Sequence, residues 1–177
     1  MVPEAPLERT EDGLLPAGEG WFVLNARDAV WRRWEGIGKW PRLEGAKPMF
    51  PQLGLGLTVL EPGEPMTMYH WEGDQEDFLV LAGEAVAIVE GEERPLRQWD
   101  FLHCPAGTNH AIVGAGETPC VVFAVGARQH QTGAYTVDPA ALRHGTGVEE
   151  ETTDPKVAYA LFGEPVTTRY QTGWLPD

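Results

Sequence analysis

Short apolar segments follow one another between residues 53 and 128, and this succession limits the fold more than any other feature of the sequence. Each segment is four to eight residues long and is bounded by Gly, Pro or Asp. Strands of that length, separated by turn residues, are typical of an antiparallel sandwich or barrel. The 21 Gly and 15 Pro among 177 residues disfavour a mainly helical protein. The sequence therefore predicts an all-β domain.

Several of these strands are apolar on both faces. In EDFLVL, Phe78 and Val80 point one way, whereas Leu79 and Leu81 point the other way. A sheet with one face in water would alternate apolar and polar residues instead. We therefore expect both faces to be covered, the outer one by the preceding Trp-rich segment, by the tail, or by a second subunit.

The chain is expected to divide into four parts. Residues 1–19 are interpreted as a loose N-terminal arm, and residues 20–52 as an extension that packs on the barrel. Within the extension, residues 26–45 show no clean period and are expected to be irregular with a helical turn. The barrel spans residues 53–137, and a helical tail spans residues 138–177.

Two short helices are predicted in the tail. Asp138 and Asp154 are each followed directly by proline. An N-cap acid with proline at the first helical position is a typical helix start. Gly145 and Gly163 follow at the distances where short helices would end.

Charge and composition exclude several classes of partner. The formal net charge of −14 repels phosphate backbones and anionic membranes, so no nucleic-acid or membrane partner is expected. The N-terminal residues do not have the pattern of a signal peptide, and no apolar run approaches 18 residues. A cytoplasmic location is the resulting expectation. Cys104 and Cys120 lie in apolar runs and are expected to be buried free thiols.

Polar residues interrupt the apolar pattern at the stretch YHWEGDQEDF. If MTMYHWE is a strand, alternation places Met66, Met68, His70 and Glu72 on one face. Glu76 opens the next strand, and a hairpin between the two strands would bring it back towards His70 and Glu72. Asp74 and Asp77 are expected to be exposed at that hairpin.

A second histidine, His110, opens a later strand after the turn at Pro105 and Gly107. Two imidazoles with one carboxylate form a facial triad suited to non-haem Fe(II), and Mn, Ni, Co and Zn use similar sets. The alternative is a surface hairpin with an ordinary histidine at the edge of a strand.

These residues resemble two motifs of the cupin family, in order and over about residues 53 to 127. In the first motif, G-x5-H-x-H-x3–4-E-x6-G, six residues instead of five separate Gly63 from His70, and Glu72 replaces the second His. Glu76 and Gly83 match. The second motif, G-x5-P-x-G-x2-H-x3-N, is matched at the following three positions: Pro105, Gly107 and His110. Trp99 and Gly114 replace its first Gly and its Asn.

The resemblance implies a cupin-type antiparallel jelly-roll β-barrel that binds one divalent ion through His70, Glu76 and His110. Glu72 is then a fourth ligand, a second-shell residue, or a general acid or base. The spacing also resembles that of 3-hydroxyanthranilate dioxygenases, which bind iron through two His and one Glu. The metal is expected to be Fe, Mn, Ni or Zn, and a small molecule is the expected partner.

Three functions remain open at the level of the sequence. The first is a metal-dependent, oxygenase-like enzyme that acts on a small organic molecule. The second is a non-catalytic binder or sensor, and the third is a metal-free, epimerase-like cupin. The resemblance also implies a homodimer that buries an apolar patch formed by the following residues: Tyr69, Trp71, Leu79 and Leu81.

Overall fold

The computed structural model describes residues 1–45 and 50–176. Residues 46–49, which belong to the expected extension 20–52, and residue 177 of the expected tail lie outside the described residues.

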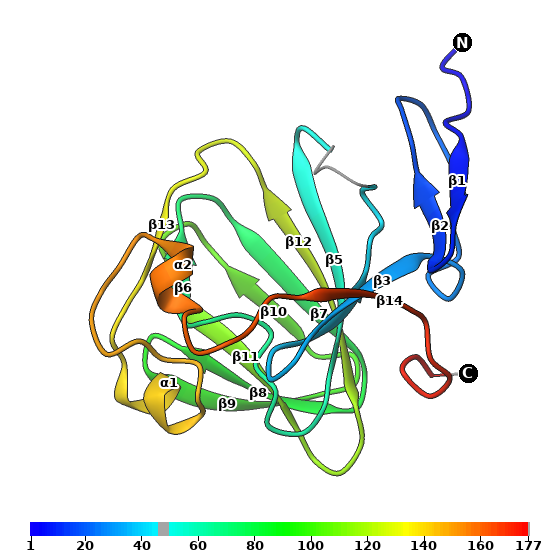
Figure 1. Cartoon of the computed structure of the whole chain (residues 1–177). Helices are drawn as coiled ribbons and strands as arrows, with labels where there is room; N and C mark the ends of the chain where they lie inside the picture. The colour runs from blue at the N-terminus through cyan, green and yellow to red at the C-terminus, as the bar shows by residue number, and fades with distance from the viewer. Residues whose placement is uncertain (46–49, 177) are drawn as a thin grey trace.

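Two antiparallel sheets face each other and form the body of the molecule (Figure 1). The seven-stranded sheet has the order β10-β7-β12-β5-β4-β3-β14, with the following bounds: β10 (Phe101–Cys104), β7 (Glu76–Ala82), β12 (Cys120–Ala127), β5 (Leu53–Leu60), β4 (Gly38–Pro41), β3 (Val30–Trp34) and β14 (Val166–Arg169). The five-stranded sheet has the order β13-β6-β11-β8-β9, with these bounds: β13 (Gly133–Tyr135), β6 (His70–Glu72), β11 (His110–Ala115), β8 (Glu84–Val89) and β9 (Glu92–Arg97). The predicted antiparallel jelly-roll barrel is confirmed.

The core lies between the two sheets. It includes Phe78 and Val80 from β7, Ala87 from β8, Ile112 from β11 and Val122 from β12, each at most 5% exposed. Because side chains alternate along a strand, Leu79, Phe123 and their neighbours point to the outer face of the seven-stranded sheet. The expectation that β7 is apolar on both faces is therefore correct.

The outer faces are covered by segments from both ends of the chain. On the seven-stranded sheet, Trp31 and Trp174 pack on Val59 and Val121. On the five-stranded sheet, Tyr69 packs with a short helix of the tail. Tyr69 therefore packs against the five-stranded sheet whereas Leu79 belongs to the seven-stranded sheet, and the single apolar patch expected from the sequence does not form.

The tail contains the two predicted helices, α1 (Pro139–Arg143) and α2 (Pro155–Ala158). The carboxylates of Asp138 and Asp154 accept hydrogen bonds from the first backbone N–H groups of these helices, as their positions before proline predict. The tail also contributes strand β14, which pairs with β3 and was not predicted.

Residues 26–45 differ from expectation, because they contain the β3–β4 hairpin instead of a helical turn. Charged residues such as Arg32 and Arg33 hide the period of the strand, whereas Trp31 is completely buried beneath the tail. Gly38 lies at φ 139°, and a Cβ there would approach Leu60 Cδ2 to 2.9 Å. Tertiary packing therefore decides the conformation of this segment.

Residues 1–19, expected to be a loose arm, contain the antiparallel hairpin β1 (Leu7–Thr10) and β2 (Gly13–Pro16), which stands beside the barrel (Figure 1). Among the described residues, no helix has the length and apolar character needed to cross a membrane. A cytoplasmic location stays a prediction.

Candidate metal centre

Three strands open with the three candidate ligands at one end of the barrel. His70 begins β6, and His110, its direct cross-strand neighbour, begins β11 of the same sheet. Glu76 begins β7, which belongs to the other sheet. The expected hairpin between the strands of His70 and Glu76 is wrong, because β6 pairs with β11 and β13 whereas β7 pairs with β10 and β12. Glu76 meets the histidines across the interior instead.

The donor atoms of these three residues converge. Glu76 Oε2 lies 3.2 Å from His110 Nε2 and 3.9 Å from His70 Nε2. The two imidazole ring centroids are 5.0 Å apart. One ligand atom from each residue lies within 4.8 Å of the others, a spacing at which one ion could contact all three.

Hydrogen bonds to the main chain orient both rings. His70 Nδ1 lies 2.7 Å from the carbonyl oxygen of Met68, and His110 Nδ1 lies 3.0 Å from that of Thr108. A carbonyl oxygen can only accept, so each Nδ1 carries the proton that it donates. The Nε2 atoms are thereby directed towards Glu76, an orientation typical of histidine ligands to metals.

Glu76 Oε2 is buried and makes no hydrogen bond within the described part of the chain. Its 3.2 Å approach to His110 Nε2 is within the distance of an ion pair, and it is attractive only when that ring is protonated. A buried carboxylate oxygen without a hydrogen bond is costly. A divalent ion at this point would satisfy it, and the N₂O donor set fits such an ion.

His110 is only 3% exposed, and its environment favours the protonated ring. Burial lowers the pKa of His110, but the Cys104 and Glu76 side chains outweigh burial and raise the pKa to about 10. A metal ion that binds Nε2 must therefore displace a proton from this ring at neutral pH.

Glu72 occupies the rim of the cluster. Its Oε1 lies 3.5 Å from His70 Nε2, and its side chain is 43% exposed. The contact with His70 lowers the pKa of Glu72, against the opposing effect of burial, so the group is a carboxylate at neutral pH. Glu72 is absent from the group of donors that lie within 4.8 Å of one another.

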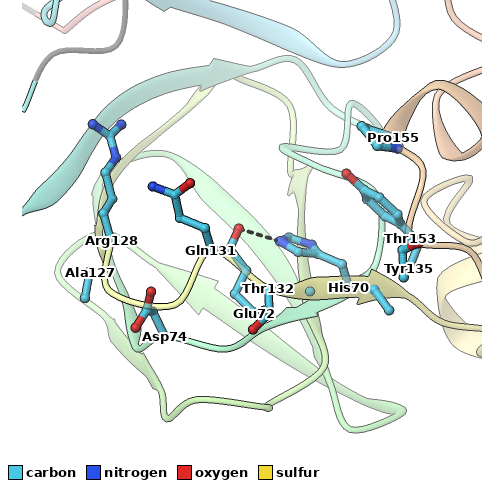
Figure 2. A pocket seen from close by; sticks show the side chains of 12 residues that line it. His70, Glu72, Asp74, Ala127, Arg128, Gln131, Thr132, Tyr135, Thr153 and Pro155 are labelled. Carbon is cyan, nitrogen blue, oxygen red and sulfur yellow. Dashed lines mark ion pairs between the residues drawn. The ribbon is translucent and has the colours of Figure 1, made fainter. Parts of the chain in front are cut away.

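A cavity of about 380 Å³ opens beside His70 and Glu72 (Figure 2). Its other walls come from β13, the loop before it and the start of α2, and they include the following polar residues: Asp74, Arg128, Gln131, Thr132, Tyr135 and Thr153. A smaller cavity of about 260 Å³ is lined by both Glu72 and Glu76. Glu72 thus lines both cavities at the rim of the cluster, next to the space in which a small molecule could lie.

Sequence reasoning missed most of this cavity. Asp74, expected to be exposed, is only 7% exposed because the loop after β12 folds over it. Met68, expected to line the pocket, packs instead against Val148 and Ala158, since the chain is not a strand before His70. Tyr135 was not predicted, and its ring centroid lies 5.7 Å from that of His70. The sequence contains no local signal for it, because it reaches the site through the pairing of β13 with β6.

The two neighbours His103 and Cys104 lie on opposite faces of β10. His103 is exposed on the outer face of β10, whereas the neighbouring Cys104 is buried in the core. Both cysteines are free and buried.

The family model for the cupin domain matches residues 56–126. The oxalate-binding protein of Thermotoga maritima is 30% identical over 66 residues, which are 37% of this chain and 54% of that protein. The match thus spans about half the length of this curated relative.

The solved structures to which the chain is similar include a sugar phosphate isomerase of the cupin superfamily from Silicibacter pomeroyi. It is 26% identical, the match covers 65% of this chain and 74% of that chain, and the TM-score is 0.48. A cupin with a double-stranded β-helix fold from Methanocaldococcus jannaschii is 18% identical, with coverage of 44% and 72% and a TM-score of 0.41. Residues 56–126 form a cupin domain.

Proposed function

We propose that His70, Glu76 and His110 bind one divalent metal ion and that the adjacent cavity holds a small organic molecule. The buried Glu76 Oε2, which makes no hydrogen bond with any described residue and faces two Nε2 atoms, is the observation that carries this proposal. Two imidazoles and one carboxylate suit Fe, Mn, Ni or Zn and leave coordination positions open.

When bound, such an ion would polarise an oxygen of the small molecule or activate dioxygen, depending on the metal. Glu72 lies beside the cluster with an ionised, partly exposed carboxylate, and it is suited to accept a proton from the small molecule. Tyr135 packs near His70 and forms the wall of the cavity on the side of β13. These roles fit an oxygenase-like reaction.

A non-catalytic binder is the second candidate. The curated relative from Thermotoga maritima bears the name of an oxalate-binding protein, which favours a small carboxylate as ligand. The two candidates share the metal centre and differ only in turnover. The metal-free, epimerase-like alternative would instead use the histidines and carboxylates as acids and bases.

Elemental analysis of the purified protein, followed by titration with Fe²⁺, Mn²⁺, Ni²⁺ and Zn²⁺, tests the proposal. We expect one ion per chain in the wild type and none in His110→Ala. His103→Ala is the matched control and should retain the ion, because its ring lies on the outer face. A wild-type protein that binds none of the four ions would exclude the metal centre and favour the metal-free alternative.

We also propose that a second copy of the chain covers the part of the outer face of the seven-stranded sheet that lies towards the edge strand β10, beyond the area on which Trp31 and Trp174 pack. A continuous cross-strand row of Phe101, Leu79, Phe123 and Leu57 lies on this face. Phe101 is 63% exposed on β10, the edge strand of the sheet. The row contains no charge, although the chain has a net charge of −14, so this face resists self-association less than a charged surface would.

Light scattering at micromolar concentration should give the mass of a dimer. Phe101→Glu should give a monomer, whereas Leu161→Glu should not change the mass. Leu161 is 91% exposed but lies beside Arg33 and Trp34 of β3, which is separated from β10 by four strands of the sheet. A wild-type monomer would contradict the dimer.

A further inference from the structure

The loop between β12 and β13 forms the wall of the cavity that faces His70 and Glu72. Arg128, Gln131 and Thr132 of this loop line the cavity. In the view of Figure 2, the Gln131 side chain projects into the space between Arg128 and His70. Gln131 is exposed at the rim of the cavity, and no hydrogen bond of its side-chain amide occurs within the described residues. The donors and the acceptor of this amide are therefore free to bind a molecule in the cavity.

Gln131 has a backbone conformation that is unusual for its residue type. Its φ angle is 44°, in the left-handed region that favours glycine. A non-glycine residue there is strained unless the surroundings hold it, and such residues are concentrated at functional sites. Glycine at this position would relieve the strain but would remove the amide that lies at the cavity.

Asp74 holds the loop in this conformation. Its Oδ2 accepts hydrogen bonds from the backbone N–H groups of Gln129 at 2.8 Å and His130 at 2.7 Å. Its Oδ1 lies 2.7 Å from His130 Nδ1. The backbone N–H of His130 first, and those of Gln129 and Gln131 after it, hold the pKa of Asp74 below its ordinary value. A buried carboxylate with these partners fixes the loop in one conformation.

The neighbouring Gly73 allows the loop to approach. Its N–H donates to the carbonyl oxygen of Thr132 at 2.6 Å, and a Cβ on Gly73 would lie 2.0 Å from Thr132 Oγ1. Gly73 and Asp74 belong to the turn that joins β6 to β7. This turn lies between the candidate ligands His70 and Glu76, and it also anchors the loop between β12 and β13, which forms the facing wall of the cavity.

We infer that Gln131 contacts the ligand, donating a hydrogen bond from its amide to a hydroxyl or carboxylate oxygen of a small molecule beside His70. Asp74 is the positioning residue that holds Gln131 there. This inference rests on the proposed function, because it assumes that the small molecule binds both to the metal centre and to Gln131.

Two variants at the cavity, Gln131→Gly and Asp74→Asn, test the inference, and each has a matched control elsewhere in the chain. Gln131→Gly removes the amide and relieves the backbone strain, so its melting temperature should not fall. Asp74→Asn removes the charge that holds the loop, so its melting temperature should fall. Both variants should bind Co²⁺ as the wild type does, because neither residue belongs to the cluster of His70, Glu76 and His110.

The probe is oxalate, titrated into the Co²⁺-loaded protein while the visible absorption of the ion is recorded. We expect both variants to bind oxalate roughly tenfold more weakly than the wild type, the effect of one lost hydrogen bond to an anion. If Gln131 and Asp74 only stabilised the fold, a variant would lose affinity for oxalate only when its melting temperature also fell. We expect instead that both variants bind oxalate more weakly although only Asp74→Asn has a lower melting temperature.

The controls repeat the same chemistry elsewhere. Trp99 has φ 75° in the turn before β10, so Trp99→Gly relieves strain of the same kind away from the cavity. Asp77 contacts His103 at 2.6 Å on the outer face, so Asp77→Asn removes a similar carboxylate–histidine contact. Both controls should bind oxalate as the wild type does.

Three results would count against these ideas, and they are distinguishable. Wild-type oxalate affinity in Gln131→Gly overturns the role of Gln131, and so does a Co²⁺-loaded wild type whose spectrum does not respond to oxalate. Wild-type affinity in Asp74→Asn overturns the positioning role of Asp74. Failure of the wild type to bind Co²⁺ instead refutes the proposed metal centre, and the inference falls with it.

Discussion

Two carboxylate–histidine pairs lie on opposite faces of β7 and differ in what their histidines do. On the inner face, Glu76 lies 3.2 Å from His110, which is 3% exposed. On the outer face, the neighbouring Asp77 lies 2.6 Å from His103, which is 49% exposed. The pairs use similar residues on adjacent positions, and they differ in burial and in the nitrogen that faces the carboxylate.

The nitrogen explains why only the inner pair is suited to a metal. His103 directs Nδ1 at Asp77, so the two groups satisfy each other in a solvated ion pair. His110 gives its Nδ1 proton to the carbonyl oxygen of Thr108 and directs Nε2 at Glu76 together with His70. A histidine near an acid is therefore weak evidence for a site until the partner of its other nitrogen is known.

The largest expected difference between the two pairs is in metal affinity. His110→Ala should weaken the binding of Zn²⁺ by more than about a hundredfold, since loss of a ligand exceeds the effect of losing a supporting residue. His103→Ala should leave the affinity unchanged. Isothermal titration calorimetry of the two variants measures both constants, and equal losses would remove the distinction between the inner and outer pairs.

The pH dependence of metal binding sharpens the comparison. The pKa of His110 is raised from 6.5 to about 10, so the metal-free ring is protonated throughout the neutral range. An ion must displace that proton, and affinity should rise roughly tenfold per pH unit until the pH approaches the raised pKa. Calorimetry in buffers of different ionisation enthalpy counts the released proton, and binding without proton release would contradict the protonated state of His110.

The position of Glu72 predicts a smaller effect. Because Glu72 lies at the rim and outside the group of three converging donors, Glu72→Gln should weaken Zn²⁺ binding by less than about tenfold. Glu76→Gln should weaken it far more. If the two variants lose affinity equally, Glu72 is a fourth ligand and the centre has two carboxylates.

The outer pair, Asp77 and His103, should contribute little to the free energy of unfolding. His103→Ala removes a half-exposed ion pair with Asp77, which should lower the free energy of unfolding by at most about 1 kcal/mol. Urea denaturation with 1 M NaCl present should reduce the difference from the wild type further, because salt screens exposed charges. A larger loss that salt does not alter would mean that this pair is part of the core.

The barrel and its three central donors were predictable because they depend on local rules. Alternation correctly placed Phe78 and Val80 inside and Leu79 outside, and the Asp–Pro pairs located both helices. The route by which Glu76 reaches the histidines was not predictable. Nothing between Glu72 and Glu76 signals that the chain passes from one sheet to the other, because sheet membership depends on pairing with strands far along the sequence.

The sequence by itself determined an antiparallel barrel of short strands and the residue types of a metal centre, since strand period, turn residues and donor chemistry are properties of neighbouring positions. Only the tertiary structure decided which imidazole nitrogen faces Glu76 and that Asp74 is buried beneath the loop of Gln131. It also decided that residues 30–41 form a hairpin beneath the tail. These outcomes depend on contacts between distant segments, whose free energy outweighs the local preferences that a sequence displays.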